Sequence, residues 1–433
     1  AEAIVRLALA AGRWFADHNN RSTNTRPIVV IGKDTRLSGY MLESAMVAGF
    51  SSIGLDCRLL GPIPTPAVAH LTRSLRAELG VMISASHNPH HDNGIKLFGP
   101  DGFKLDDRIE SEISALAEGS ISLAKAHELG RARRMLDSVG RYVEFAKSTL
   151  PGRTRLEGLK LVVDCANGAA YRTAPDALYE LGAEVVPLAI MPDGFNINED
   201  CGAVHPQVMA AAVVAHGADA GICLDGDADR LIMADENGTI INGDQILGCL
   251  ALAMQEKGTL STNTVVGTVM SNRGLETMLG KADIDLYRVA VGDRYILEKM
   301  RNDELNLGGE PSGHILMTDF ARSGDGLLTA LQMLTLLKGS TKKASALFNG
   351  FKPNPQRLEN LTGIDPIILR REPLRAAIRE IENGLGKRGR VLVRPSGTEA
   401  LIRVMVEAES ELLLTATMDA LILRIKEEID KDK

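Results

Sequence analysis

The sequence is poor in aromatic residues, which make up 4% of its 433 residues and include a single Trp. This argues against the stacked aromatic side chains with which proteins bind single-stranded nucleic acid. Positive charge is not in excess either, because 49 Lys and Arg face 56 Asp and Glu for a net charge of −7. We therefore expect no nucleic-acid partner, although a local basic pocket for a small anion is compatible with this charge.

Cysteine is scarce and shows no pattern. The five cysteines are an odd number and form no C-x-x-C pair, which argues against a disulfide framework or a thiolate zinc site and favours a reducing cytoplasm. No apolar run approaches the roughly 18 residues of a membrane span, and no signal peptide opens the chain, so no membrane partner is expected. The chain opens inside a helix pattern, and we expect a short N-terminal piece to be missing.

One strand–turn–helix–strand pattern occurs three times. Short β-branched runs begin each copy, at Pro27–Gly32, Leu159–Asp164 and Thr264–Val269. Each run is followed by a polar turn, a helical stretch and a second strand. The copies match in pattern and only weakly in residue identity. The repetition predicts three tandem, similar α/β domains with mixed sheets.

The last stretch has a different pattern. A helix at Leu374–Leu385, two strands at Arg390–Arg394 and Leu401–Glu407, and a closing amphipathic helix predict a C-terminal α+β domain. We place the linker before this domain at Lys352–Pro366. The four predicted domains are residues 1–155, 156–256, 257–365 and 366–433.

The first loop that carries candidate catalytic residues is Ile83–Asn93, which follows the apolar run Leu79–Ile83. Ser84 and Ser86 are candidate nucleophiles, because an α/β sheet exposes functional groups where its strands end. The titratable neighbours in and after the loop are His87, His90, His91 and Lys96. A loop merely capped by Ser and Asn is the alternative, and it stays open on this segment alone. The absence of nearby cysteine disfavours a zinc site.

The second loop is DGDADR, with apolar runs on both sides. Asp225, Asp227 and Asp229 alternate on a tight turn and can converge on one hard cation, for which Mg²⁺ is the expected ion. An EF-hand would use these positions together with Glu236, but Arg230 stands where its loop requires Gly. A purely acidic turn is disfavoured because the three carboxylates repel one another.

Two further loops suit a phosphorylated sugar. In GGEPSGHI, Glu310, Ser312 and His314 alternate, so that in an extended segment all three would point the same way, toward sugar hydroxyls. In RPSGTEALIR, backbone N–H groups, hydroxyls and two arginines suit a phosphate monoester, although a β-turn with solvated arginines is the alternative. The residues of this phosphate loop are Arg394, Ser396, Gly397, Thr398 and Arg403.

These four loops fall one in each predicted domain. The segments ISASHNP…DNGIK, DGDADR, E-x-S-G-H and R-x-SGTE…IR resemble, in this order, the four signatures of the α-D-phosphohexomutase superfamily. The resemblance covers essentially the full chain. The segments GKDTRLSG, GPIPTP, GDRYILEKM and IRVMVE favour the branch that acts on glucosamine phosphates. The resemblance implies an isomerase whose domains surround a central active-site cleft.

The resemblance also implies residue roles. Ser86 would carry a phosphoryl group, and Lys96 or His87 would accept the proton of the sugar hydroxyl, a choice that stays open. One Mg²⁺ would be bound by Ser86, Asp225, Asp227 and Asp229, with Arg230 beside it. Residues that bind the substrate would be Arg36, Glu310, Ser312, His314, Arg394, Ser396, Gly397, Thr398 and Arg403.

The implied reaction interconverts glucosamine 6-phosphate and glucosamine 1-phosphate through a bisphosphorylated sugar, and its product feeds amino-sugar nucleotide and cell-wall synthesis in the bacterial cytoplasm. A homodimer is a further expectation. Phosphomannomutase or phosphoglucomutase activity is the nearest alternative; a metal-dependent phosphatase and a calcium-binding scaffold are more distant ones. Three departures from the family pattern stand out: Ala228 in place of a common Gly, Pro311 in place of Asn or Gln, and no Gly–Thr–Asp–Gly–Ile–Arg-like loop before the first helix.

Overall fold

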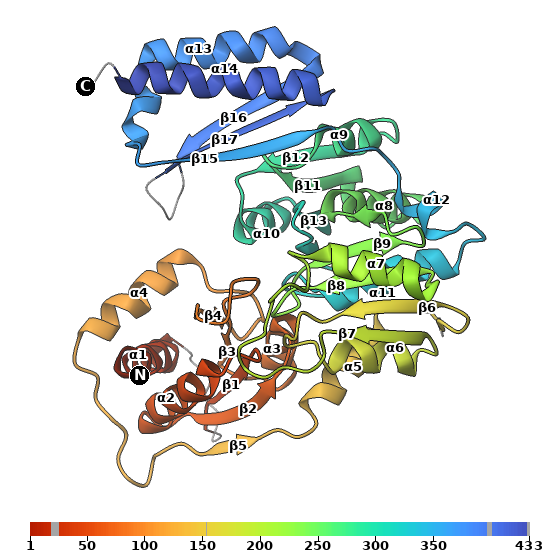
Figure 1. Ribbon diagram of the computed structural model, residues 1–433. Coiled ribbons are helices and arrows are strands. Elements are labelled where there is room, and N and C mark those ends of the chain that lie inside the picture. Colours follow the sequence, from red (N-terminus) through yellow and green to blue (C-terminus); the bar gives the residue numbers. More distant parts are fainter. Residues whose placement is uncertain (19–25, 153, 396–400, 431–433) are drawn as a thin grey trace. The chain divides into compact units, whose positions relative to one another are not determined.

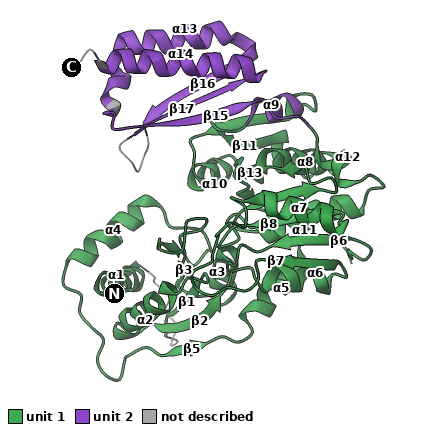
Figure 2. Cartoon of the chain, in the orientation of Figure 1, with its two compact units in different colours: residues 1–271, 279–350 green, residues 272–278, 351–433 purple. Residues whose placement is uncertain are grey.

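The computed structural model describes the whole chain except residues 19–25, 153, 396–400 and 431–433. The described residues form two compact units (Figure 2). The larger unit contains residues 1–271 and 279–350, and the smaller unit contains residues 272–278 and 351–433. The larger unit carries three sheets and the smaller unit one.

The first α/β domain lies in the red and orange part of the chain (Figure 1). Its elements are α1 (Glu2–His18), β1 (Ile28–Lys33), α2 (Ser38–Ser52), β2 (Asp56–Pro62), α3 (Thr65–Ser74), β3 (Leu79–Ile83), β4 (Ile95–Phe98), α4 (Asp107–Glu118), β5 (Ala132–Arg134) and α5 (Ser138–Ser148). The strand order is β4-β3-β1-β2-β5. The β-branched run at the centre of β1 is fully buried, as a central parallel strand covered on both faces requires.

The second α/β domain has the strand order β10-β9-β8-β6-β7. Its elements are β6 (Lys160–Asp164), α6 (Thr173–Glu180), β7 (Glu184–Leu188), α7 (Pro206–His216), β8 (Ala220–Leu224), β9 (Leu231–Asp235), β10 (Ile240–Ile241) and the following α8 (Gly243–Glu256). Helix α8 begins with a capping box, in which the Asn242 side chain accepts from the Gln245 N–H and the Gln245 side chain accepts from the Asn242 N–H.

The third α/β domain has the strand order β12-β11-β13-β14. Its elements are the 3₁₀ turn η1 (Ser261–Asn263), β11 (Thr264–Thr268), α9 (Arg273–Gly280), β12 (Asp285–Val289), α10 (Asp293–Asn302), β13 (Leu307–Gly309), β14 (Ile315–Met317), α11 (Gly326–Lys338) and α12 (Ala344–Phe348). Asp325 caps α11, because its side chain accepts a hydrogen bond of 2.9 Å from the Leu328 N–H.

The three domains repeat one order of elements, β-α-β-α-β-β. In each, the first strand is central and pairs in parallel with the second and third strands. The fourth strand then returns antiparallel to the third. The prediction of three tandem, similar α/β domains with mixed sheets is therefore confirmed, and the repeat extends further along the chain than the pattern found in the sequence.

Residues 351–433 of the smaller unit contain the predicted α+β domain. Its elements are β15 (Gln356–Thr362), η2 (Pro366–Arg370), α13 (Glu372–Leu385), η3 (Gly386–Arg388), β16 (Gly389–Pro395), β17 (Leu401–Ala408) and α14 (Glu411–Asp430). Strand β17 lies between β15 and β16 and is antiparallel to both. Helices α13 and α14 lie side by side on one face of this sheet (Figure 1), and together they bury an aliphatic core.

One prediction about this region is wrong. The stretch Lys352–Pro366, expected as a linker, contains the strand β15, which pairs with β17 over its whole length from Gln356 to Thr362. The polar sequence of β15 hid this strand, because only alternate side chains are covered. All five cysteines are buried and free. Among the helices of the described residues, none has the length and apolarity needed to span a bilayer.

Candidate active site

Three of the predicted functional loops occupy equivalent places in the three α/β domains. The serine loop joins β3 to β4, the aspartate loop joins β8 to β9, and the loop with Glu310 joins β13 to β14. Each is the hairpin connection between the third and fourth strands of its domain. The repeated fold therefore presents one functional loop per domain from the same topological position.

The aspartate loop is the point at which the three domains meet. Its successive carbonyl groups accept backbone hydrogen bonds from three different domains. The Gly226 carbonyl accepts from the Ala169 N–H of the second domain at 2.8 Å. The Asp227 carbonyl accepts from Thr65 of the first, and the Ala228 carbonyl from Gly326 of the third, both at 3.0 Å. The loop backbone is thus held from three sides.

Ala228 adopts a left-handed backbone conformation in this loop, with φ of +58°. This conformation costs an L-residue on the order of 1 kcal/mol and is the one that Gly adopts freely. The hydrogen bond from the Ala228 N–H to the Asp225 carbonyl, at 3.0 Å, closes the turn nonetheless. The departure noted in the sequence therefore places a strained residue between two of the three converging carboxylates.

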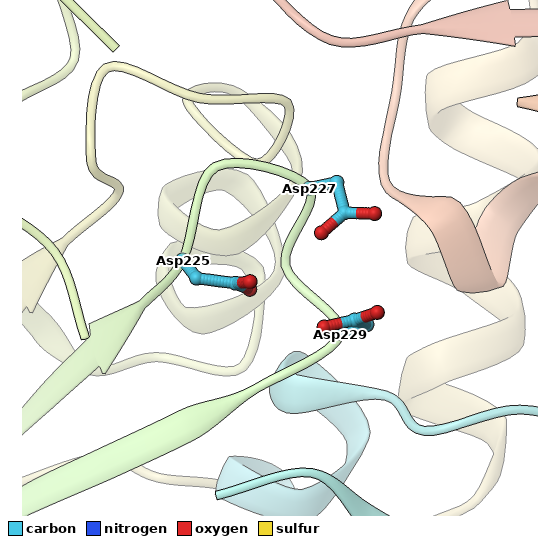
Figure 3. A group of neighbouring side chains, drawn as sticks. All are labelled: Asp225, Asp227 and Asp229. Carbon is cyan, nitrogen blue, oxygen red and sulfur yellow. The ribbon is translucent and has the colours of Figure 1, made fainter. Parts of the chain in front are cut away.

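The three aspartates converge as predicted (Figure 3). Asp225, Asp227 and Asp229 are all buried, and one carboxylate oxygen of each lies within 4.8 Å of the other two. The Oδ1 atoms of Asp227 and Asp229 are buried and accept no hydrogen bond from the described residues. Burial, followed by repulsion from the other two carboxylates, raises the pKa of Asp225 to about 8. A hard divalent cation would satisfy these oxygens and offset the repulsion, so the donor set fits Mg²⁺.

Cationic side chains surround the triad. The Lys96 Nζ donates to Asp227 Oδ2 at 2.6 Å and to Asp229 Oδ2 at 2.9 Å. Burial opposes the charge of Lys96, but these two carboxylates outweigh it and raise the pKa of Lys96 above its ordinary value. The Arg230 Nε lies 3.9 Å from an Asp229 oxygen and 4.0 Å from an Asp225 oxygen. In this state Lys96 is a charged partner of the triad.

Ser86 reaches the triad directly. Its Oγ donates a hydrogen bond of 2.7 Å to Asp225 Oδ2, and its backbone is left-handed with φ of +51°. Ser84 points elsewhere, because its Oγ donates to Asp34 Oδ2 at 2.7 Å and accepts from the Ser86 N–H at 2.9 Å. Of the two candidate nucleophiles, Ser86 has its hydroxyl at the carboxylates, and Ser84 supports the backbone that presents it.

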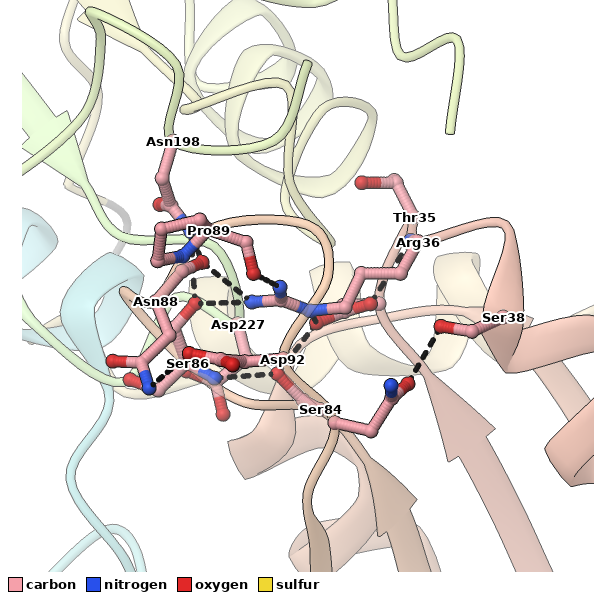
Figure 4. Close-up of polar contacts among 12 residues, drawn as sticks. Thr35, Arg36, Ser38, Ser84, Ser86, Asn88, Pro89, Asp92, Asn198 and Asp227 are labelled. Atoms are coloured by element: carbon pink, nitrogen blue, oxygen red, sulfur yellow. Dashed lines mark hydrogen bonds and ion pairs between the residues drawn. The ribbon is translucent and has the colours of Figure 1, made fainter. Parts of the chain in front are cut away.

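Arg36 and Asn198 hold the serine loop in place (Figure 4). The Arg36 guanidinium donates to Asp34 at 2.8 Å and to the carbonyl groups of Ser86, Asn88 and Pro89. The Asn198 amide donates to the first two of these carbonyl groups, at 2.9 and 3.0 Å. These bonds hold the backbone of the loop that presents the Ser86 hydroxyl to Asp225.

The prediction that Arg36 binds substrate is not supported by this geometry. Its side chain is 2% exposed, and four of its five N–H groups are used by Asp34 and the loop carbonyls. Arg36 is therefore a positioning residue. Sequence reasoning missed Asp34, Asn198 and Thr65, whose hydroxyl donates to Asp227 Oδ2. Asp34 and Thr65 lie within the segments GKDTRLSG and GPIPTP, which served above only to favour one branch of the family, and Asn198 lies in a segment without a motif. Each contacts a group at least 50 residues away along the chain.

Arg36→Lys is expected to lower kcat by roughly 10–100-fold with little change in KM. The lysine keeps a charge beside Asp34 but cannot donate to three carbonyl groups at once, so Ser86 loses its fixed position. Steady-state kinetics with a sugar phosphate checks this, and circular dichroism checks the fold. An increase in KM at constant kcat would instead indicate that Arg36 binds the substrate, as the sequence predicted.

The histidines of the serine loop differ from one another. His87 is half-buried, and burial followed by the charge of Arg230 lowers its pKa. Its Nδ1 is buried and has no hydrogen-bond partner among the described residues. His90 and His91 are exposed, and the His90 ring packs edge-on against Phe195 at 5.6 Å. Of these three serine-loop histidines, only His87 therefore lies among the charged groups of the triad.

The loop with Glu310 is a turn, so the expectation of an extended segment is wrong. The Gly313 N–H donates to the Glu310 carbonyl at 3.0 Å, and Gly313 has φ of +91°. The Ser312 hydroxyl donates to one Glu310 oxygen at 3.2 Å, and the Gly292 N–H donates to the other at 3.0 Å. His314 turns instead to Asp229, with its Nδ1 3.6 Å from the carboxylate. Burial opposes the charge of His314, but Asp229 outweighs it and raises the pKa of His314.

The predicted phosphate-binding arginines lie in the smaller unit. Arg394 on β16 and Arg403 on β17 are directly opposite each other in the register of the two strands. Burial, and then the charge of Arg403, lowers the pKa of Arg394. Like charges placed opposite each other destabilise a sheet, and an anion bound to both would offset this. The predicted ligands Ser396, Gly397 and Thr398 lie outside the described residues.

Comparison with known proteins agrees with this architecture. Four family models of phosphoglucomutase/phosphomannomutase match in order: α/β/α domain I at residues 2–122, domain II at 140–238, domain III at 242–353 and the C-terminal domain at 356–424. A phosphoglucomutase/phosphomannomutase family protein from Burkholderia thailandensis has a similar structure, with a TM-score of 0.83 at 25% identity over 98% of this chain and 93% of that one.

Curated relatives are more similar in sequence. A phosphoglucosamine mutase from Paracoccus denitrificans is 54% identical over 98% of this chain and 95% of its own length. One from Maricaulis maris is 55% identical over 97% of this chain and 93% of its own length. The fold and the site together define a phosphohexomutase, which is an isomerase. Within that superfamily, the chain belongs to the phosphoglucosamine mutase family.

Proposed function

We propose that this enzyme interconverts glucosamine 6-phosphate and glucosamine 1-phosphate. The observation that carries the proposal is the hydrogen bond from the Ser86 hydroxyl to Asp225, at the point where the three repeated domains meet. The names of the relatives support the amino sugar as the substrate. In this reaction Ser86 is phosphorylated at the start of each cycle.

Each cycle contains two phosphoryl transfers. In the first, the bond between phosphorus and the Ser86 Oγ breaks, a bond to the free sugar hydroxyl forms, and the hydroxyl proton leaves to a base. The resulting sugar carries two phosphates. In the second transfer the phosphoryl group that the substrate first carried passes to Ser86. Its bond to the sugar oxygen breaks, a bond to the Ser86 Oγ forms, the sugar oxygen takes up a proton, and the isomeric sugar phosphate is released. Such transfers depend on in-line positioning and on stabilisation of charge.

The charged groups around Ser86 fit this task. Asp225, Asp227 and Asp229 would hold Mg²⁺ beside the phosphoserine, and when bound the cation would supply charge stabilisation for the phosphoryl oxygens. Arg230 lies close enough to this site to contribute a second positive charge. The proton acceptor remains the predicted pair of Lys96 and His87, between which the pH dependence of Lys96→Ala and His87→Gln variants would decide.

The remaining substrate contacts are proposals from the loops. Glu310, Ser312 and His314 would bind ring hydroxyls, and the phosphate that does not react would be bound by Arg394, Ser396, Gly397, Thr398 and Arg403. The reducing cytoplasm suits an enzyme with five free thiols and phosphorylated sugar substrates. There the product would enter amino-sugar nucleotide and cell-wall synthesis. The homodimer and the four domain boundaries remain predictions.

The test is turnover of glucosamine 6-phosphate with Mg²⁺ and a trace of glucose 1,6-bisphosphate as phosphoryl donor, followed by phosphorus NMR. Glucosamine 1-phosphate is expected to form well above the corresponding products from mannose 6-phosphate and glucose 6-phosphate, and EDTA is expected to stop the reaction. A preference for mannose or glucose phosphate would change the proposed substrate but leave the proposed phosphoryl transfer through Ser86 in place. Net release of inorganic phosphate would indicate a phosphatase instead.

A further inference from the structure

The larger unit contains a cavity of ≈ 640 Å³ that opens beside the aspartate triad. Lys96, Asp229 and His314 line it beside the triad, and helix α10 forms one wall. Further cationic side chains line it, which suits the phosphate groups of a sugar phosphate. They are Lys104, Arg108, Arg294, Arg301 and Arg322.

The cavity nevertheless contains four more carboxylates besides Asp229. They are Asp106, Asp107, Asp293 and Glu298. Asp106 caps α4 by accepting from the Ile109 N–H at 2.9 Å, and Asp107 forms an ion pair with Arg294. Glu298 is exposed and lies five residues, about 7.5 Å, further along α10 from the triad end. These three are therefore engaged elsewhere or lie away from the site of reaction.

Asp293 is the carboxylate that is both near the triad and loosely held. It is the first residue of α10, half-buried, and its nearest cationic partner is the Lys104 Nζ at 3.8 Å, beyond hydrogen-bond distance. One oxygen accepts only from the adjacent Arg294 N–H, at 2.9 Å. Burial would raise the pKa of Asp293, but the charges of His314, Lys104 and Lys96 lower it, which keeps this cavity-lining carboxylate ionised.

We propose that Asp293 binds the ammonium group of the amino sugar and thereby selects glucosamine phosphates over phosphates of neutral hexoses. The proposal rests on the proposed function and adds a specificity-determining residue to it. An ammonium group donates up to three hydrogen bonds, and the Asp293 oxygens have accepting capacity left for it. A neutral hexose offers a hydroxyl at this position, which forms a weaker bond with a carboxylate than a cation does.

Other carboxylates are poorer candidates for this role. Glu310 already accepts from the Gly292 N–H with one oxygen and from the Ser312 hydroxyl with the other, and it belongs to the loop proposed to bind ring hydroxyls. Asp229 is shared between Lys96, His314 and the predicted metal. Asp293 therefore provides an acidic contact without competing with the groups that hold Mg²⁺.

The test compares Asp293→Asn with the wild type on two ligands. The value of kcat/KM is measured with glucosamine 6-phosphate and, in reverse, with glucosamine 1-phosphate, because the sugar must bind in two orientations. Glucose 6-phosphate is then used as a competing ligand, and its Ki is measured in the same reaction. Asparagine keeps the size of the side chain and removes its charge. We expect kcat/KM for the amino sugar to fall roughly 10–100-fold in at least one direction, with the Ki of glucose 6-phosphate changed less than about 3-fold.

Two further variants sharpen the result. Asp293→Glu restores the charge and is expected to recover part of the lost kcat/KM. Asp303→Asn removes a carboxylate that pairs with Lys299 at the end of the same helix, away from the cavity, and is expected to behave as wild type. The proposal would be overturned if Asp293→Asn weakened kcat/KM for the amino sugar and the binding of glucose 6-phosphate equally. It would also be overturned if neither value changed. A wild-type enzyme without turnover of glucosamine phosphates would overturn the proposed function as well, before any variant is made.

Discussion

Replacing Ser86 with alanine is expected to abolish the mutase reaction, with a fall in kcat of at least about 10⁴-fold. The reason is chemical, because the variant has no oxygen at this position to carry a phosphoryl group. The Ser86 Oγ is the hydroxyl of the loop that contacts Asp225, at 2.7 Å, and no other side chain of the described loop makes that contact. Coupled assay of glucosamine 1-phosphate formation checks the activity.

Ser84→Ala is the matched control, since it removes the same atom two residues away. Ser84 bonds to Asp34 and to the Ser86 N–H, so its loss should loosen the loop and lower kcat by only about 10-fold. Intact-mass spectrometry after incubation with glucose 1,6-bisphosphate separates the two roles. Ser84→Ala should take up one phosphoryl group and Ser86→Ala none. The reverse pattern would make Ser84 the phosphoryl carrier and refute the proposed mechanism.

Asp225→Asn is expected to remove the stabilisation of the protein by Mg²⁺. Binding to the folded state alone stabilises the wild type by about 2.7 kcal/mol when the free ion is at 100 times its Kd. If the loss of one of three carboxylates weakens binding about 100-fold, the same concentration would stabilise the variant by less than about 0.5 kcal/mol. Thermal unfolding with and without Mg²⁺ measures both values.

In EDTA we expect the Asp225→Asn substitution to have the opposite effect on the stability of the protein. Asp225 is buried against two other carboxylates, and Asn relieves that repulsion, so the metal-free variant should be at least as stable as the metal-free wild type. Glu236→Gln is the control, since Glu236 is the residue that an EF-hand would require. It accepts from the N–H and the hydroxyl of Ser345 instead. Loss of the Mg²⁺ effect in this control would contradict the assignment of the ligands to the triad.

The sequence alone was sufficient for features that depend on neighbouring residues. Short β-branched runs bounded by turn residues predicted the strands β1, β6 and β11. The alternating aspartates of DGDADR carry their spacing with them into a tight turn. The repeated order of these runs predicted the three α/β domains for the same reason. The family signatures are likewise short, continuous segments, so they could be found without knowledge of the fold.

Predictions from local sequence pattern were wrong where strand pairing or turn geometry determines the structure. The segment Gln356–Thr362 is polar and is a strand only because β17 provides its hydrogen-bond partners. The alternation of Glu310, Ser312 and His314 suggested one common direction, but the positive φ of Gly313 closes a turn. In this turn the Ser312 hydroxyl bonds to Glu310, while His314 turns to Asp229. Period-two arguments hold only for extended backbone.

The sequence by itself determined which residue types are available for phosphoryl transfer, because the loops that carry them are continuous in the chain. Only the tertiary structure decided how those residues act together. Arg36 became a support for the serine loop because the fold buries it against loop carbonyls, and Asn198 joined it from a position 112 residues away from Ser86. Such contacts depend on the packing of separate domains, and no local property of the chain encodes them.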